Sequence, residues 1–308
     1  MLVNNPVVVD YRHNYVRLAF IIGTLTLFIG HVAVNQMFEE GHNTLFPNAT
    51  ILAEHTVKNE AQPTRWVYTL LNAINTIWQF AWIIYTLTYL FRRSTTGYLY
   101  LEPSTLTPSF YVTYILGFLI QTVWLIFFHG YVNWAWLPYL ASFVLLSVSL
   151  FILNNNLTLN RKIYETEGLN RDIWLLRFLT QNGVAFFACW AGVRFVLTLD
   201  VFLQRNLSFS IQNAGTVCLL IAFVIALGYF LGPNINAVYV EQCAYQFAPW
   251  IVFIVYFWGV VQHNWVPRQA TRNNILAAIE LIATLVMSII AILLFVIRYS
   301  RSKIDRLV

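Results

Sequence analysis

The sequence predicts an all-α integral membrane protein with about eight transmembrane helices. Of its 308 residues, 59% are hydrophobic and only 10% are charged, whereas soluble domains carry about 25% charged residues. The mean hydropathy of +0.63 arises from repeated apolar stretches of about 20 residues, the length that crosses the hydrocarbon core of a bilayer as a helix. This composition excludes a soluble globular domain, and nothing in it implies a nucleic-acid partner.

The apolar stretches place the spans in order along the chain. The predicted spans are Tyr15–Met37, Trp66–Phe91, Phe110–His129, Val132–Leu153, Ile173–Leu199, Ala214–Leu231, Pro249–Trp265 and Ile275–Ile297. The first 17 residues are too polar for a cleaved signal peptide, so the first span is expected to double as a signal anchor.

Each span ends where polar or charged residues begin. The first is followed by the connector EEGHNTLFPNATILAEHTVKNEAQPTR, the second by RRSTTGYLYLEPSTLTPS and the fourth by NNNLTLNRKIYETEGLNRD. The segments QRNLSFSIQ, GPNINAVYVEQCAYQ and VPRQATRN separate the last four spans. The link HGYVNW between the third and fourth spans is the shortest connector, which makes it the weakest of the predicted breaks.

The distribution of Lys and Arg predicts cytoplasmic termini, because cytoplasmic connectors carry an excess of positive charge. That orientation places Arg12, Arg17, Arg92, Arg93, Arg161, Lys162, Arg171, Arg298, Arg301, Lys303 and Arg306 inside, and Lys58, Arg65, Arg205, Arg268 and Arg272 outside. The glycosylation sequons at Asn48 and Asn206 then lie outside, whereas the sequon at Asn156 lies inside and would stay unused. We expect the plasma membrane or another membrane of the secretory pathway.

Four polar residues within the spans are predicted to lie at one depth. His31, Asn72, Arg194 and Glu280 each lie about six residues, or roughly 9 Å, from the outer end of a span. Asn35, Gln262 and His263 are shallower, and Asn75, Gln79 and Gln121 are deeper. An isolated charge at this depth is costly, so Arg194 and Glu280 are predicted to form an intramembrane ion pair.

This polar layer has two interpretations. It lines a cavity that opens toward the outer face, or it consists of hydrogen bonds that join neighbouring membrane helices. The deep tryptophans, which include Trp78, Trp82, Trp124 and Trp190, fit the wall of such a cavity but equally fit a packed core.

The order of motifs resembles the tryptophan-rich sensory protein and translocator protein family (TspO/MBR). QPTRWVY followed by NTIWQFAWIIY is similar to the aromatic patch and second helix of that family. IQTVWLIFFHG at 120–130 and NGVAFFACWAGVRF at 182–195 resemble its third and fifth helices. The family carries Asn where this chain has Gln121, and its aromatic patch lies closer to the residue equivalent to Trp78.

The resemblance implies a five-helix core with a pocket for hydrophobic ligands such as tetrapyrroles or sterols. The chain would then consist of a cytoplasmic segment (1–14), the five-helix core (15–199), three additional transmembrane helices (200–297) and a basic cytoplasmic tail (298–308). By the same resemblance, Trp66 and Trp78 would lie at the mouth and wall of the pocket, Trp124 on the third helix, and Ala188 and Trp190 on the fifth. Arg194 and Glu280 would be additions of this chain.

The sequence therefore predicts a sensor, receptor or carrier that binds a hydrophobic small molecule. The predicted ligand-binding residues are Trp66, Asn72, Asn75, Trp78, Gln79, Trp82, Gln121, Trp124, Ala188 and Trp190, beside a polar layer of His31, Asn35, Arg194, Glu280 and His263. No cofactor is required beyond the tetrapyrrole-like or sterol-like ligand. The expected partners are the lipid bilayer and this ligand, with a homo-oligomer left open.

Two alternatives remain open at this stage. In a transporter or channel, the polar layer would hydrate a path for a solute. A membrane-embedded enzyme would require His31, His129 or His263 to meet Glu280, and the sequence carries no hydrolase, protease or nucleotide-binding motif. The cysteines Cys189, Cys218 and Cys243 lack the spacing of a zinc site or a disulfide framework and are expected to serve packing.

Overall fold

The computed structural model describes residues 13–40, 58–95, 97–235, 242–265 and 269–304. The helices are α1 (Tyr15–Glu40), α3 (Arg65–Thr88), α4 (Pro108–Phe127), η1 (Val132–Trp134), α5 (Trp136–Thr166), α6 (Asn170–Leu175), η2 (Leu176–Gln181), α7 (Asn182–Asn206), α8 (Ile211–Ile235), α10 (Ala248–Asn264) and α11 (Arg272–Ile304). No strand occurs in these residues, apart from an isolated bridge between Arg93 and Tyr98. The prediction of an all-α chain is confirmed.

Each predicted span coincides with one long helix. Six helical segments within the described residues are long and apolar enough to cross a membrane: Tyr15–Phe38, Pro108–Phe127, Val132–Thr166, Asn170–Asn206, Ile211–Gly232 and Arg272–Ile297. The helix α10 has only 17 residues, and α3 carries three amides within its apolar sequence. The structure thus supports a multi-pass membrane protein, and the number of eight spans stays a prediction.

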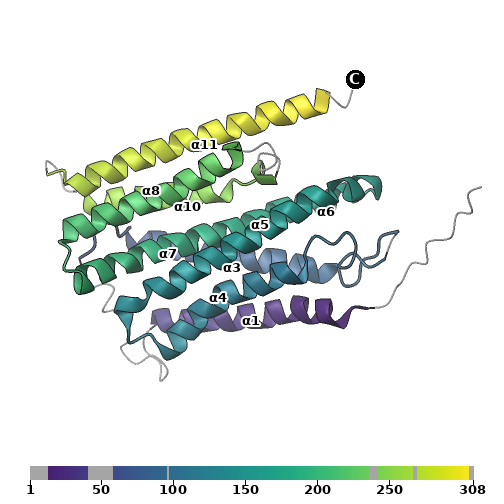
Figure 1. Cartoon of the computed structure of the whole chain (residues 1–308), viewed down its shortest axis with the longest axis horizontal. Coiled ribbons are helices and arrows are strands. Elements are labelled where there is room, and N and C mark those ends of the chain that lie inside the picture. The colour runs from purple at the N-terminus through teal and green to yellow at the C-terminus, as the bar shows by residue number, and fades with distance from the viewer. Residues whose placement is uncertain (1–12, 41–57, 96, 236–241, 266–268, 305–308) are drawn as a thin grey trace, which may run out of the picture.

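The long helices run side by side in one elongated bundle (Figure 1). Along the bundle, α1 and α4 lie at one side, α5 and α7 in the middle, and α8 and α11 at the other side. Because successive long helices alternate in direction, α1 begins and α11 ends at the same end of the bundle. We call this the terminal end, and the other the opposite end.

The helix α7 forms the centre of the bundle. It contacts α3, α5, α8 and α10, and every residue from Asn182 to Val193 is buried. Two glycines permit close approach to α3: a Cβ atom on Gly183 would lie 3.1 Å from Trp82 Cδ1, and one on Gly259 of α10 would lie 2.4 Å from Val67 Cγ2. The two sides of the bundle are therefore joined through α3 and α7.

The run from α6 to α7 is continuous but contains one turn of π-helix, η2. A π-helical turn is a rare insertion that shifts the side chains after it around the helix axis, and such turns occur frequently at functional sites. Here it separates the short α6 from the buried centre at the terminal end, beside a cavity of about 290 Å³.

Candidate functional site

Two cavities among the described residues differ strongly in character. The aromatic cavity has a volume of about 290 Å³ and lies toward the terminal end. The polar cavity has a volume of about 80 Å³ and lies toward the opposite end. The second contains most of the predicted polar layer, whereas the first was not predicted.

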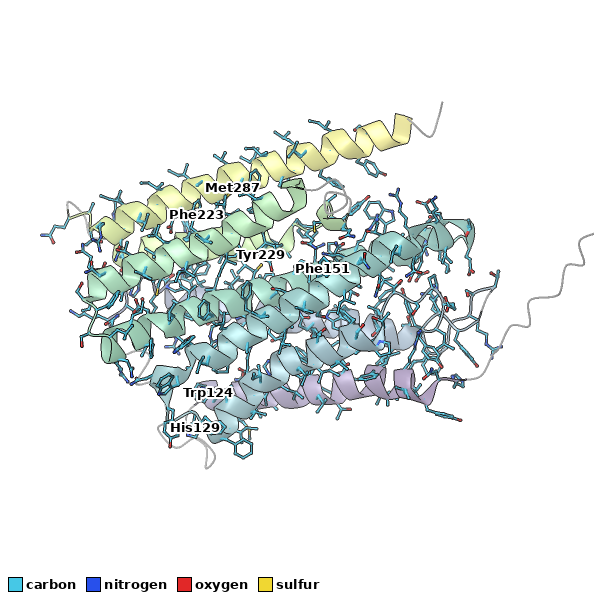
Figure 2. All side chains as sticks on the ribbon, in the orientation of Figure 1. Trp124, His129, Phe151, Phe223, Tyr229 and Met287 are labelled. Carbon is cyan, nitrogen blue, oxygen red and sulfur yellow. The ribbon has the colours of Figure 1, made fainter. Side chains whose placement is uncertain are left out.

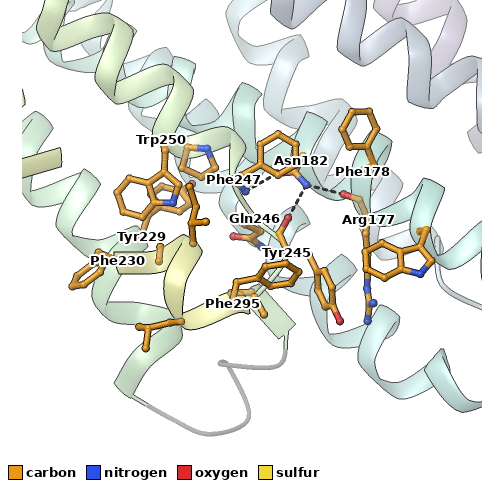
Figure 3. A pocket seen from close by; sticks show the side chains of 17 residues that line it. Arg177, Phe178, Asn182, Tyr229, Phe230, Tyr245, Gln246, Phe247, Trp250 and Phe295 are labelled. Carbon is orange, nitrogen blue, oxygen red and sulfur yellow. Dashed lines mark hydrogen bonds between the residues drawn. The ribbon is translucent and has the colours of Figure 1, made fainter. Parts of the chain in front are cut away.

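The aromatic cavity is built from segments far apart in the chain (Figure 3). They are α6 and the π-helical turn, the end of α8, the residues just before α10, the start of α10, and α11. Its aromatic wall consists of Trp174, Phe178, Tyr229, Phe230, Tyr245, Phe247, Trp250 and Phe295. Its polar lining consists of Arg177, Asn182, Cys243 and Gln246.

Asn182 holds two of these segments together. Its Nδ2 donates to the carbonyl oxygens of Arg177 and Tyr245, each at 2.9 Å. Its Oδ1 accepts from the backbone N–H of Phe247 at 2.8 Å and of Ala248 at 3.0 Å. The first N–H groups of α10 are thus satisfied by a side chain of α7, since the residues at the start of a helix have no partner within it. This buried amide fixes the position of the π-helical turn relative to α10.

Arg177 lies among aromatic rings rather than in solvent. Its guanidinium carbon lies 3.7 Å from the ring centre of Tyr245 and 5.6 Å from that of Trp174, and only 7% of the residue is exposed. Stacking on aromatic faces is a favourable environment for a guanidinium group. The arrangement gives the otherwise apolar wall one positively charged side.

The wall also contains one hydrogen-bond donor without an acceptor. Gln246 Nε2 is buried and has no hydrogen-bond partner within the described residues. Burying such a donor unsatisfied costs about 1–3 kcal/mol. Because Gln246 lines the cavity, rotation of its side chain toward an oxygen on a bound molecule would remove this cost, so the cavity suits an apolar molecule that carries an oxygen.

A buried amide cluster lies behind this wall. Gln181 Nε2 donates to Asn154 Oδ1 and to the carbonyl oxygen of Gln242, each at 2.8 Å. Asn154 Nδ2 in turn contacts Cys243 Sγ at 3.8 Å. Sequence reasoning missed this region. A signal that could have located it was the clustering of amides inside predicted spans or at their ends, namely NNN at 154–156 and the pair Gln181–Asn182.

The polar cavity brings together most of the residues predicted to share one depth. Its lining includes His31, Asn35, Asn72, Asn75, Gln121, Trp190 and Arg194. Most of these side chains bond to neighbouring helices or within their own helix. Trp190 Nε1 donates to Asn72 Oδ1 at 2.7 Å, and His31 Nδ1 lies 2.8 Å from Thr122 Oγ1. Their hydrogen bonds join α1 to α4 and α3 to α7.

Gln79 is the centre of the polar face of α3. Its Nε2 donates to the carbonyl oxygen of Gly183 at 2.9 Å and to Asn75 Oδ1 at 3.1 Å. Its Oε1 accepts from Trp82 Nε1 at 2.7 Å and from the Tyr114 hydroxyl at 3.0 Å. Gln79 and Trp82 are fully buried and line neither cavity. This part of the predicted site is interhelical hydrogen bonding.

The predicted contact between Arg194 and Glu280 is wrong. Both carboxylate oxygens of Glu280 are buried without a hydrogen-bond partner, and Arg194 Nη2 donates to the Tyr139 hydroxyl at 2.7 Å. The physical reason is direction around the bundle: Arg194 points from α7 toward α5, whereas α11 packs against α8 and α10. Equal depth in a membrane does not bring two residues together.

The remaining predicted site residues lie away from both cavities. Trp66 is 41% exposed and donates to Gln262 Oε1 at 2.7 Å. Trp124 stacks on Phe128 near the end of α4, beside His129 and far from Tyr229 of the aromatic cavity (Figure 2). Ala188 is buried in the centre of α7.

Trp78 is the one predicted ligand-binding residue close to the aromatic cavity. It packs against Phe178 and Phe247, with ring centres 5.9 Å apart in each pair. Its Nε1 donates to the carbonyl oxygen of Phe178 at 3.2 Å. It supports the cavity wall from behind without lining it.

The predicted histidines do not meet Glu280. His31 lines the polar cavity, His129 Nδ1 lies 3.0 Å from the carbonyl oxygen of Leu125 in its own helix, and His263 is exposed near the end of α10. No group of three or more His, Cys, Asp or Glu residues suited to a metal ion occurs in the part of the chain that the structure describes.

Of the two predicted glycosylation sites, the structure describes one. Asn206 is the exposed last residue of α7 at the opposite end of the bundle. Asn48 lies outside the described residues.

Comparisons with protein families, with curated proteins and with solved structures find no match to this chain. The similarity to the TspO/MBR family therefore stays a prediction from short sequence motifs. What the fold and the cavities establish is an all-α chain of the multi-pass membrane type with a large aromatic cavity and a small polar one.

Proposed function

We propose that this protein is an eight-span membrane receptor, sensor or carrier that binds a hydrophobic small molecule in the aromatic cavity. The observation that carries the proposal is a cavity of about 290 Å³ walled by eight aromatic side chains. Small-molecule sites are typically concave, largely apolar and about 300–1,000 Å³ in volume, with a few polar groups that orient the ligand.

The polar groups of the wall define the kind of molecule. Aromatic faces favour flat ring systems, and Gln246 Nε2 favours a ligand with a carbonyl, carboxyl or hydroxyl oxygen. Arg177 adds positive charge to the same side. Sterol-like and tetrapyrrole-like molecules combine these features and are the first classes to test.

If the termini are cytoplasmic, the aromatic cavity lies in the cytoplasmic half of the membrane, since it lies toward the terminal end. The proposed ligand would then enter from the cytoplasm or the inner leaflet. This differs from the outward-facing cavity that the sequence predicts.

The test is to fill each cavity in turn. Ala291 of α11 lines the aromatic cavity, and Val32 of α1 lines the polar one. We expect Ala291→Phe to weaken binding of a sterol or a metal-free porphyrin by at least about tenfold, which corresponds to roughly 1.4 kcal/mol. Val32→Phe should leave the affinity unchanged. Binding is measured by tryptophan fluorescence quenching and by native mass spectrometry of the purified protein.

The opposite result would support the alternative function, a transporter or channel. That alternative relies on the polar cavity, in which Asn72, Arg194 and His31 converge from three helices. If Val32→Phe abolished a solute flux in proteoliposomes and Ala291→Phe did not change ligand binding, the polar layer would be the functional path and our proposal would be wrong.

A further inference from the structure

Glu280 is a buried acid that the proposed ligand site does not use. It lies within the membrane-spanning part of α11, and only 2% of the residue is exposed. Neither Oε1 nor Oε2 has a hydrogen-bond partner in the part of the chain that the structure describes. Among the buried acids of the described chain, Asp172 pairs with Arg92 and Asp200 accepts a hydrogen bond from Gln204. Glu280 differs from both in lacking any donor.

The described residues around Glu280 supply no compensating charge. On its own helix, Ala277 and Thr284 are fully buried, and the Thr284 hydroxyl donates to the backbone carbonyl oxygen of Glu280 rather than to its carboxylate. The helix packs against α8 and α10. On α10, Tyr256 donates its hydroxyl to the carbonyl oxygen of Ala61, and the titratable residues of α8 are the buried Cys218 and the partly buried Tyr229, neither of which carries a positive charge.

The charged groups of α7 are also engaged elsewhere. Arg194 Nη2 donates to Tyr139, and Asp200 accepts from Gln204. An ionised carboxylate in this position would lose its hydration without gaining a counter-charge or a hydrogen bond, which is very unfavourable in a membrane. The neutral acid avoids most of this cost.

We propose that Glu280 is a proton-binding site, occupied by a proton in the observed packing of α11 against α8 and α10. The proton can leave only when water or a cation reaches the carboxyl group, and this requires α11 to separate from its neighbours. The helix lies at one side of the bundle and contacts mainly α8 and α10, so its separation would disturb few other helices. Protonation and helix packing would thus be linked.

The test uses the full-length protein in liposomes and the membrane-permeant reagent dicyclohexylcarbodiimide. This reagent takes up the proton of a carboxylic acid and adds the carboxylate oxygen to its central carbon, so that it modifies neutral acids in apolar surroundings. We expect mass spectrometry to find the adduct on the peptide containing Glu280 at neutral pH. A water-soluble carbodiimide should not label it. Glu280→Gln should lose the adduct, and Asp200→Asn should retain it.

Infrared spectroscopy of the unmodified protein provides a second measurement. We expect the carbonyl stretch of a protonated carboxyl group at neutral pH, absent in Glu280→Gln. Since Gln resembles the neutral acid, this variant should unfold at the same temperature as the original chain. If the variant lost a carboxylate band instead, or if the original chain lacked the carbonyl stretch of a protonated carboxyl group, Glu280 would be ionised and the proposal overturned. The second criterion needs only the original chain, so it still decides if the variant fails to fold.

Discussion

The aromatic cavity and the polar cavity lie toward opposite ends of one bundle and follow opposite principles. The polar cavity is where many hydrogen-bonding side chains converge, yet it encloses only about 80 Å³. The aromatic cavity contains few polar groups and encloses about 290 Å³. Amides and hydroxyls approach one another to hydrogen-bond, and so they fill the space between helices. Rigid rings held apart by backbone segments leave space open.

Each region depends on one amide that makes four hydrogen bonds. Asn182 does so beside the aromatic cavity, and Gln79 does so on the polar face of α3. Asn182 bonds only to backbone groups, whereas Gln79 bonds mostly to side chains. The following variants test whether this difference separates a ligand site from a structural network.

The largest effect is expected for Asn182→Ala. The variant removes four hydrogen bonds to backbone groups, and we expect the free energy of unfolding to fall by about 3 kcal/mol or more. Ligand binding at the aromatic cavity should be lost with it. Unfolding in detergent is followed with a thiol-reactive fluorophore, because Cys189 and Cys218 are buried and react only after the bundle opens.

Asn206→Ala is the matched control, since Asn206 is exposed at the other end of the same helix. It should unfold at the temperature of the original chain. If Asn182→Ala unfolded at the same temperature as this control, the four hydrogen bonds of Asn182 would not stabilise the cavity.

A smaller effect is expected for Gln79→Leu. Leu has a side chain of similar size to that of Gln but no polar atoms. The substitution therefore removes the hydrogen bonds of Gln79 with Trp82 Nε1, the Tyr114 hydroxyl and the Gly183 carbonyl oxygen. We expect a loss of about 2 kcal/mol in the same thermal assay, with unchanged affinity for the hydrophobic ligand. Gln212→Leu at the exposed start of α8 serves as control. Loss of affinity without loss of stability would move the ligand site to the polar face.

The smallest effects concern Arg194. A double-mutant cycle of Arg194→Ala with Tyr139→Phe should give a coupling energy of about 1 kcal/mol, because the two side chains form a hydrogen bond. The cycle of Arg194→Ala with Glu280→Gln should be additive within about 0.5 kcal/mol. If Arg194 were instead coupled to Glu280 and additive with Tyr139, the ion pair predicted from the sequence would be correct.

The helices and the polar cavity could be predicted from the sequence. Apolar length and polar connectors locate each long helix, since crossing a bilayer demands both. His31, Asn72 and Arg194 could be placed together because depth within a span follows directly from residue number.

The aromatic cavity and the position of Glu280 could not be predicted in the same way. Depth says nothing about the direction of a side chain around the bundle, and this direction separates Glu280 from Arg194. The π-helical turn at Leu176–Gln181 changes that direction again for part of one span. The cavity also requires residues 243–247 from a connector, whose position no helical pattern specifies.

The hydrogen bonds of Asn182 have a consequence for how the chain could be cut. They join residue 182 to residues 245, 247 and 248, sequence separations of 63 to 66. The helices α7 and α8, with the segment that leads to α10, therefore form a loop whose two ends are tied by one side chain. A protease that cleaves within this loop would leave α10 and α11 attached to the rest of the bundle, and the two fragments should purify together as a complex.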